Sequence, residues 1–224
     1  MEDFNDINNN DNRISEREAM VEEQLKSRGL INEAVLTSML TVPRHLFVPE
    51  EQGDFAYYDG PLSIGEGQTI SQPYIVAYMI EALHPRKDDR VLEIGTGSGY
   101  AAAVLSRLVS EVYTVERLET LAKQAEKLLK KLKYENVEVV IGDGTKGLPD
   151  KAPFDGIIVS AASPVIPKSL VDQLNTGGRM VIPLGDRNMQ ELILIYKDTE
   201  GFIKERNLGS VRFVPLIGDE GWEK

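Results

Sequence analysis

Three glycines stand at alternate positions in the segment VLEIGTGSGYAAA (91–103), directly after a short apolar run that predicts a buried strand. Because glycine has no side chain, Gly95, Gly97 and Gly99 would let a ligand lie against the backbone where the strand ends and a helix begins. The dinucleotide-binding pattern places its third glycine one residue later, beneath a pyrophosphate. The spacing therefore favours a nucleotide without a pyrophosphate, and a plain tight turn is the structural alternative.

Three carboxylates follow or precede this loop at positions where a ligand would need them. Glu116 ends the next predicted strand, where an acid accepts hydrogen bonds from both ribose hydroxyls of an adenosine. Asp143, in GDG after the third predicted strand, could accept one from an adenine amino group. Glu93 lies inside the first strand, where a carboxylate costs several kcal/mol unless a cation or a donor pairs with it. A ligand ammonium would supply that partner, and the three acids together indicate S-adenosylmethionine.

Two of these acids also have a purely structural alternative. Glu116 could form a salt bridge with Arg117 or Lys123, and Asp143 with its following glycine is a common turn signal. The Lys-rich stretch 123–133 is interpreted as a solvated helix face.

The elements that must position these residues alternate strictly between strand and helix. Strands are predicted over 91–94, 112–116, 137–141, 156–160 and 180–184, and helices over 99–109, 117–133 and 164–175. This order predicts right-handed crossovers and a parallel sheet covered on both faces. Two further strand-like runs, 191–197 and 211–216, have no helix between them and predict antiparallel C-terminal strands. The predicted fold class is α/β, a Rossmann-like doubly wound sheet.

The residues before this core predict a helical extension with a loop that serves function. Residues 1–13 are mostly Asn, Asp and Glu and predict a disordered tail. A helix should then begin at a capping box of Ser15 with Glu18 and end at Gly29, and a second should span 32–41. The Pro-, Gly- and aromatic-rich stretch that follows is too long for a simple connection and is the expected substrate surface. A third helix is expected from Pro73.

We expect one domain over 14–224, divided into this extension (14–72) and a cofactor-binding core (73–224). The chain has 36 acidic and 25 basic residues, a formal charge of -11 that disfavours nucleic acid as a partner. Without cysteine and with two histidines, it offers no thiolate and few ligands, so no metal site is expected. No apolar run approaches the length of a membrane span, and the start of the chain lacks the features of a secretory signal. We therefore expect a cytoplasmic protein.

From Ile14 to Trp222 the chain resembles the protein-L-isoaspartate O-methyltransferases, which methylate the misplaced carboxylate of L-isoaspartyl residues in damaged proteins. The glycine segment is shared with many methyltransferases. More specific matches are VPRHLFVP (42–49), YYDGPLSIGEGQTISQP (57–73), GDGTKG (142–147) and VRFVPL (211–216). The residues after Leu216, IGDEGW, match less closely, so contacts made there are left open.

The resemblance implies that the chain transfers a methyl group from S-adenosyl-L-methionine to isoaspartyl proteins and peptides, as a monomer, leaving S-adenosyl-L-homocysteine. It implies that Ser71 is the active-site hydroxyl, that 68–72 covers the methionine end of the cofactor, and that 42–49 and 211–216 clasp the substrate peptide. The residues expected to bind cofactor are Gln68, Thr69, Ile70, Ser71, Glu93, Gly95, Thr96, Gly97, Ser98, Gly99, Glu116, Arg117, Asp143 and Gly144. Those expected to bind substrate are Arg44, His45, Tyr58 and Val214.

Several of these residues keep structural alternatives. Ser71 is also a suitable N-cap for the helix that begins at Pro73. Arg44 could pair with a surface acid, His45 could be an exposed loop residue, and Tyr58 could be a half-buried loop anchor.

The expected reaction needs no general base. An isoaspartyl carboxylate has a reference pKa near 4 and is already ionised at neutral pH, so the protein must mainly align the reactants and exclude water. A nicotinamide-dependent oxidoreductase is disfavoured by the glycine spacing and Glu93, and a non-enzymatic adenosine-binding module leaves 67–73 unexplained. A methyltransferase of small molecules is the nearer alternative.

Overall fold

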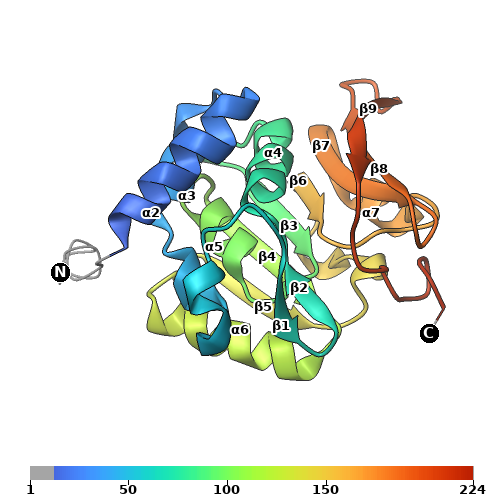
Figure 1. The fold of residues 1–224 in the computed structure, drawn as a ribbon. Coiled ribbons are helices and arrows are strands. Elements are labelled where there is room, and N and C mark those ends of the chain that lie inside the picture. The colour runs from blue at the N-terminus through green and yellow to red at the C-terminus, as the bar shows by residue number, and fades with distance from the viewer. Residues whose placement is uncertain (1–12, 224) are drawn as a thin grey trace.

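The computed structural model describes residues 13–223. They form a central seven-stranded sheet with helices packed against it (Figure 1). The strand order is β5-β4-β3-β6-β7-β8-β9. The strands are β3 (Arg90–Ile94), β4 (Glu111–Glu116), β5 (Val137–Ile141), β6 (Phe154–Val159), β7 (Leu174–Gly185), β8 (Gln190–Lys197) and β9 (Ile203–Val211). The first five strands in this order, from β5 across to β7, are parallel to one another. Strand β8 pairs antiparallel with β7, and β9 pairs antiparallel with β8. The predicted α/β class and its antiparallel ending are confirmed.

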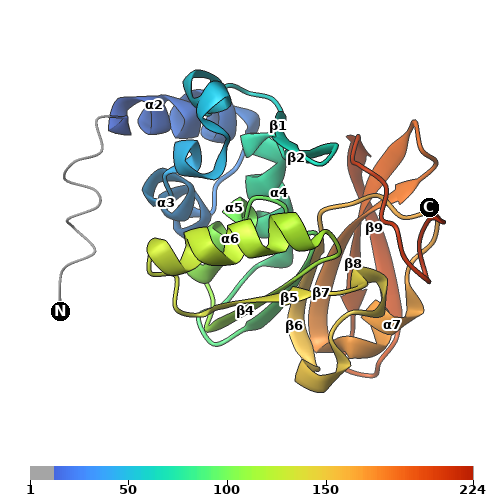
Figure 2. The ribbon, with the colours of Figure 1, turned by 90° about the horizontal axis from the view of Figure 1, so that it is seen from below.

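Both faces of the sheet are apolar because its central strands alternate between two cores. Val91 and Val112 pack into one core with α4 (Pro73–Leu83), α5 (Tyr100–Ser106) and α6 (Glu119–Lys131). Leu92 and Ile94 point the other way, into a core with the short helix α7 (Lys168–Gln173). Figure 2 shows α4, α5 and α6 on one side of the sheet and α7 on the other. This is the arrangement that strictly alternating strands and helices predict.

The first predicted helix forms, but it does not start as predicted. Helix α2 (Ile14–Ala19) has Arg13 as its N-cap residue and no side-chain cap, so the capping box of Ser15 and Glu18 is wrong. Arg13 instead forms an ion pair with Glu16 at 2.6 Å. The disordered tail was predicted over 1–13. Arg13 is part of the folded structure, and the other twelve residues lie outside the described ones.

The rest of the N-terminal extension agrees more closely with prediction. After α2 the chain continues through a π-helical turn (Met20–Leu25) and a 3-10 turn (Lys26–Arg28) to Gly29, which has a left-handed φ of 88°. Helix α3 (Glu33–Thr41) follows, and the side chain of Asn32 caps it by accepting from the backbone N–H groups of Ala34 and Val35.

A small hairpin connects this extension to the core. Two 3-10 turns (Arg44–Phe47 and Glu50–Phe55) lead into β1 (Leu62–Gly65) and β2 (Gln68–Ile70), which pair antiparallel. Helix α4 then begins at Pro73, as predicted. The hairpin lies close to the carboxyl ends of the parallel strands, since a Cβ on Gly97 would come 3.3 Å from Ile64.

The segment 211–216 is not the strand that its composition predicts. Strand β9 ends at Val211, and the chain then crosses to the end of β6, where Ala162 N–H donates to Val214 O (2.7 Å) and accepts from Leu216 N–H (2.8 Å) through its carbonyl. Pro215 has no N–H, which prevents a continuous ladder. Prolines also shorten the helix predicted over 164–175, because α7 begins only after Pro167. None of the helices described in residues 13–223 is long and apolar enough to span a membrane.

Candidate active site

A pocket opens at the carboxyl ends of β3, β4 and β6, where the chain order reverses. One wall is the loop after β3, the opposite wall is β2 with Ser71, and the third is the C-terminal segment 214–217. Open α/β sheets bind ligands at such a reversal because the loops on either side diverge there. We call this the inner pocket. Its polar and glycine lining residues include Gln68, Thr69, Ser71, Glu93, Gly95, Thr96, Gly97, Ser98, Glu116, Arg117, Gly144 and Ser160.

The three loop glycines have different roles. Gly95, Gly97 and Gly99 have φ values of 93°, 52° and 86°, a region that side chains disfavour. Gly95 and Gly97 line the inner pocket, as predicted for close backbone approach. Gly99 lies outside the lining, and a Cβ there would meet Leu129 of α6 at 3.2 Å. The close approach to Leu129 supports a role in helix packing, and the predicted ligand contact of Gly99 stays a prediction.

Glu116 is aimed into the inner pocket by backbone donors. Its Oε2 accepts from Gly97 N–H at 3.0 Å and its Oε1 from Leu118 N–H at 2.9 Å, and the residue is 6% exposed. The predicted salt-bridge alternative does not form, since Lys123 pairs with Glu119 at 2.5 Å. Each carboxylate oxygen has a lone pair left, so the group can still accept from a pair of hydroxyls while it orders the glycine loop.

Glu93 is a buried acid with one oxygen satisfied. Its Oε2 accepts from the Thr114 hydroxyl at 2.6 Å, and that hydroxyl lies 2.7 Å from the Thr96 hydroxyl, which must then donate to it. Its Oε1 has no partner among residues 13–223, although Glu93 lines the inner pocket. Burial, with the charge of Glu116 added, raises the pKa of Glu93 to about 8. A cation placed here would satisfy the free oxygen and favour the charged form.

Asp143 is used by the fold rather than by the inner pocket. Its Oδ1 accepts from the N–H and hydroxyl of Thr145 (2.9 and 2.7 Å), and its Oδ2 accepts from Asp219 N–H (2.9 Å). Asp143 is absent from the pocket lining, whereas the backbone of Gly144 is part of it. A Cβ on Gly144 would come 2.4 Å from Ile94, so glycine is required there. The turn-forming role, not the predicted adenine contact, is what these contacts support.

Ser71 lies opposite the glycine loop and is not a helix cap. The N-cap residue of α4 is Gln72, and it makes no side-chain cap hydrogen bond. Within the described chain the Ser71 hydroxyl has no hydrogen-bond partner. Ser71 lines the inner pocket and also a second cavity beside it. Its hydroxyl is therefore available to a bound molecule.

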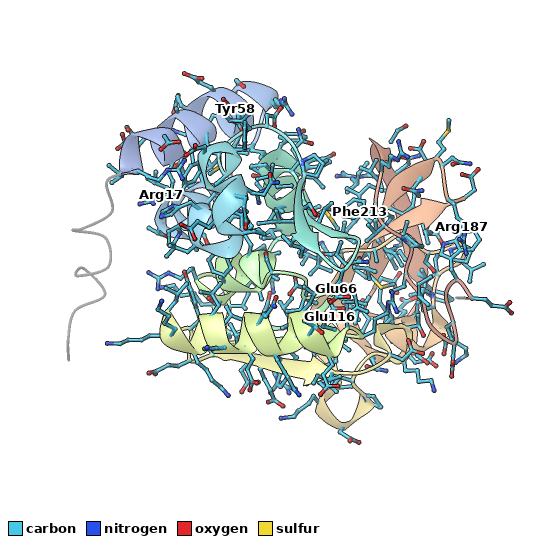
Figure 3. The ribbon with its side chains drawn as sticks, turned by 60° about the horizontal axis from the view of Figure 1, so that its bottom comes forward. Arg17, Tyr58, Glu66, Glu116, Arg187 and Phe213 are labelled. Atoms are coloured by element: carbon cyan, nitrogen blue, oxygen red, sulfur yellow. The ribbon has the colours of Figure 1, made fainter. Side chains whose placement is uncertain are left out.

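The second cavity, which we call the outer groove, joins the inner pocket at four shared residues: Thr69, Ser71, Ser160 and Val214. Its remaining lining comes from the hairpin, α4 and the end of β9, namely Pro61, Gln72, Ile75, Ser210, Val211, Arg212 and Phe213. In Figure 3, Phe213 lies between the hairpin and the C-terminal strands, and Glu116 lies nearer α6. A ligand in the inner pocket and one in the outer groove would meet beside Ser71.

Val214 lies where a substrate contact was predicted, but the other three predicted substrate residues do not. Arg44 is 0% exposed and donates to the backbone carbonyls of Ala56 and Ser71, so its predicted contact with an anionic substrate group is wrong. His45 and Tyr58 line neither cavity.

The surroundings of these two residues explain why they stay outside the site. The His45 Nδ1 atom lies 2.6 Å from the Tyr57 hydroxyl. Tyr58 is 63% exposed and packs edge-on against Phe55, on the helical side of the molecule in Figure 3. Both are therefore loop residues, but His45 is partly buried rather than exposed, and Tyr58 is exposed rather than half-buried.

Sequence reasoning missed Ser160 and Ser210, whereas Val211, Arg212 and Phe213 belong to the motif 211–216 on which the resemblance rests. Ser160 directly follows β6, and the carboxyl end of a central parallel strand is itself a signal for a binding residue. Ser210 carries no such signal, since its place depends on how β9 packs. Among residues 13–223 no group of three His, Asp or Glu side chains could hold a metal ion.

Comparison with known proteins identifies the family to which this architecture belongs. A family model of protein-L-isoaspartate(D-aspartate) O-methyltransferase matches residues 15–221. A protein-L-isoaspartate O-methyltransferase of Pelotomaculum thermopropionicum is 61% identical over 95% of this chain and 93% of that protein. One from Methanoculleus marisnigri is 55% identical over 93% of this chain and 94% of that protein.

Solved structures agree with these relatives. A protein-L-isoaspartate O-methyltransferase superposes with a TM-score of 0.83 at 30% identity, over 92% of this chain and 67% of that one. The enzyme of this kind from Plasmodium falciparum, solved with S-adenosyl-L-homocysteine, gives 0.77 at 27% identity, over 90% of this chain and 98% of that one. With its extension, hairpin and C-terminal segment all included in these matches, the chain belongs to the protein-L-isoaspartate(D-aspartate) O-methyltransferase family.

Proposed function

We propose that the chain transfers a methyl group from S-adenosyl-L-methionine to the free α-carboxylate of L-isoaspartyl residues in damaged proteins and peptides. The observation that carries this is the pair of buried acids, Glu93 and Glu116, which lie on either side of the glycine loop in a pocket that opens to the outer groove at Ser71. Family membership supports the same activity.

The residues of the inner pocket fit this cofactor. The unsatisfied Oε1 of Glu93 suits an ammonium group, and the two oxygens of Glu116 suit the ribose hydroxyls. The backbone of 95–98 forms one side, and Gln68, Thr69 and Ile70 cover the other. When bound, S-adenosyl-L-methionine supplies an electrophilic methyl group on a sulfonium and becomes S-adenosyl-L-homocysteine. We also assign Arg117 and Gly144 to this site, on the same lining.

Ser71 is the residue that we assign to the reacting carboxylate. Its hydroxyl can donate a hydrogen bond to one carboxylate oxygen and so hold the other toward the inner pocket. No base is required, because an isoaspartyl carboxylate with a reference pKa near 4 is ionised at neutral pH. His45, one of the chain's two histidines, lines neither cavity and contacts Tyr57, which agrees with a reaction that needs alignment rather than proton transfer.

Apolar side chains keep water away from this point. Val76, Met79, Tyr100 and Ile158 line the inner pocket, and each is less than a tenth exposed. Joining a carboxylate to a cationic centre disperses charge, and a dry lining favours that change over the separated ions. Correct placement of the two reacting groups could contribute about 7 to 11 kcal/mol.

The outer groove is the proposed seat of the peptide backbone, with Val214 at its inner end. We propose that residues 14–72 and 73–224 form one domain, because the hairpin and the sheet share both cavities. We also propose a cytoplasmic monomer whose partners are isoaspartyl-containing proteins, without nucleic acid or membrane. The formal charge of -11 opposes self-association and the approach of anionic partners.

The test is methyl transfer from labelled cofactor to a matched pair of peptides, one L-isoaspartyl and one L-aspartyl. A normal aspartyl residue carries its carboxylate one methylene further from the main chain, and a misplacement near 1 Å costs about a hundredfold in rate. We expect a base-labile ester on the isoaspartyl peptide, formed at least about a hundredfold faster than on its partner. Equal labelling of both, or of neither while a small catechol or amine is methylated, would favour the small-molecule alternative.

A further inference from the structure

Arg44 is a buried cation whose hydrogen bonds go to backbone carbonyls. Its Nε donates to Ala56 O and its Nη2 to Ser71 O, both at 2.8 Å, and its guanidinium carbon lies 4.9 Å from the centre of the Tyr100 ring. The residue is 0% exposed, and no carboxylate in the described chain forms an ion pair with it. Burial lowers the pKa of Arg44 to about 10, so the group is still charged at neutral pH.

Burying a guanidinium carries a desolvation cost that an apolar side chain of similar size would not have. Carbonyl acceptors and an aromatic face offset that cost only in part, because neither carries an opposite charge. What the guanidinium provides and methionine does not is a rigid fork of donors. That fork joins two carbonyls from separate segments, one before the hairpin and one directly after it.

The second of these carbonyls belongs to the residue with the exposed hydroxyl. Ser71 follows the last residue of β2 and precedes Gln72 and Pro73, where α4 begins. Proline confines Gln72 to an extended conformation, observed as φ -50° and ψ 137°. The remaining freedom lies in the peptide plane that carries Ser71 O. A donor on that oxygen sets the orientation of this plane and, with it, the direction in which the Ser71 side chain points.

We propose that Arg44 is a positioning residue for the methyl transfer: through the carbonyl of Ser71 it holds the Ser71 hydroxyl at the junction of the inner pocket and the outer groove. This inference rests on the proposed role of Ser71. It gives a mechanistic purpose to an arginine that touches neither cavity, and it makes the segment 42–49 part of the active site's support.

A double-mutant cycle tests the proposal. We would measure kcat, the KM for an isoaspartyl peptide, S-adenosyl-L-homocysteine affinity and the melting temperature for wild type, Arg44→Met, Ser71→Ala and the double variant. Arg44→Met should lower kcat about ten- to a hundredfold per folded molecule. The KM for the peptide and the affinity for S-adenosyl-L-homocysteine should stay within about twofold of the wild-type values. In the Ser71→Ala background the same change should cost no more than about twofold, because there is no hydroxyl left to position.

Arg17→Met is the matched control. Arg17 is also buried, at 1% exposed, and donates to the Leu40 carbonyl and the Tyr57 hydroxyl, and it forms no hydrogen bond with Ser71. Figure 3 shows it among the N-terminal helices, away from Glu116 and Phe213. The Arg17→Met variant should therefore have a lower melting temperature than wild type and an unchanged kcat per folded molecule. Arg44→Lys keeps the charge and one donor, so it should recover part of the lost kcat; it also carries the cycle if Arg44→Met does not fold.

The outcomes separate the two hypotheses. If Arg44→Met lowers kcat by the same factor in both backgrounds, or lowers only the melting temperature, Arg44 is structural and the inference is overturned. If Ser71→Ala alone leaves kcat unchanged, the proposed role of Ser71 is lost, and the inference about Arg44 with it.

Discussion

The inner pocket and the outer groove lie side by side, but they are built on different kinds of support. The two acids of the inner pocket sit on central strands, and their directions follow from strand register and from donors at the same edge of the sheet. These donors are the N–H groups of Gly97 and Leu118 for Glu116 and the Thr114 hydroxyl for Glu93. The outer groove is assembled from the hairpin, α4, the end of β9 and the segment that crosses to β6. Rigid strands thus shape the proposed cofactor site, whereas long-range contacts such as those of Arg44 hold the proposed substrate site in place.

This contrast predicts two classes of variant. Changes in the inner pocket should act mainly on cofactor affinity, and changes at its junction with the outer groove should act mainly on turnover.

The largest effect is expected for Ser71→Ala, at the junction. Since the hydroxyl should orient the attacking carboxylate, we expect kcat to fall about a hundredfold, the order of cost for removing one oriented donor. Cofactor affinity should stay within about twofold, and the melting temperature should not change, because Ser71 caps no helix. Steady-state kinetics, calorimetry and thermal unfolding on one preparation measure all three, with Ser63→Ala, an exposed serine of the same hairpin, as control. If Ser71→Ala instead lost cofactor affinity and kept kcat, Ser71 would belong with the residues that bind the cofactor.

Glu116→Ala should give the largest effect inside the inner pocket. It removes the proposed ribose acceptor and frees the N–H groups of Gly97 and Leu118. We expect cofactor binding to weaken by roughly 1 to 3 kcal/mol, with kcat at saturating cofactor changed far less. Titration calorimetry with S-adenosyl-L-homocysteine measures the loss. Glu119→Ala, which removes an exposed acid of α6, should bind normally, and equal losses in both variants would contradict the assignment.

Glu93 should make the unliganded protein sensitive to pH. Its pKa rises from an ordinary value of 4.5 to about 8 on folding, so the folded chain holds an extra proton between these values. The free energy of unfolding should therefore fall as the pH rises through this window, and affinity for the ammonium-bearing cofactor should increase toward pH 8 as Glu93 ionises.

The variant Glu93→Gln keeps the shape of the side chain and has no proton to lose. It should remove Glu93's share of both pH dependences and weaken S-adenosyl-L-homocysteine binding about tenfold at pH 8. Thermal unfolding and calorimetry between pH 5 and about 8 would show this. If the variant keeps the wild-type slope of affinity with pH, Glu93 does not bind the ammonium.

The smallest effect is expected for Asp143→Asn, which separates a pocket residue from a neighbour that only supports the fold. The change weakens the acceptor of Thr145 and Asp219, so the free energy of unfolding should fall by about 1 kcal/mol. Cofactor affinity should stay within about twofold. Chemical denaturation and calorimetry distinguish the two, with the exposed Asp150→Asn as reference. A large loss of affinity would restore the predicted adenine contact.

Much of the fold could be predicted because each strand of the parallel sheet has a local pattern of apolar residues. The runs at 91–94, 112–116 and 137–141 all became parallel strands, since an alternating or continuous apolar run is a property of neighbouring residues. Helix boundaries were less predictable. The Ser15 capping box failed although its residue types were suitable, because the N-cap residue is Arg13, two residues earlier, and Arg13 pairs with Glu16.

The positions of Gly95, Gly97, Glu93 and Glu116 at one pocket were determined by the sequence alone. Parallel strands bring their carboxyl ends to one edge of the sheet. A residue at the end of such a strand can therefore be placed at that edge from the sequence alone. The environments of Arg44, Asp143 and the segment 211–216 could not be predicted in this way. Their residue types are compatible both with a contact to a ligand and with a contact inside the fold. Whether an arginine faces solvent or two carbonyls depends on which segments fold over it, and here those carbonyls belong to residues 56 and 71. Only tertiary packing decides that, because the burial of a charge is balanced by partners distant in sequence.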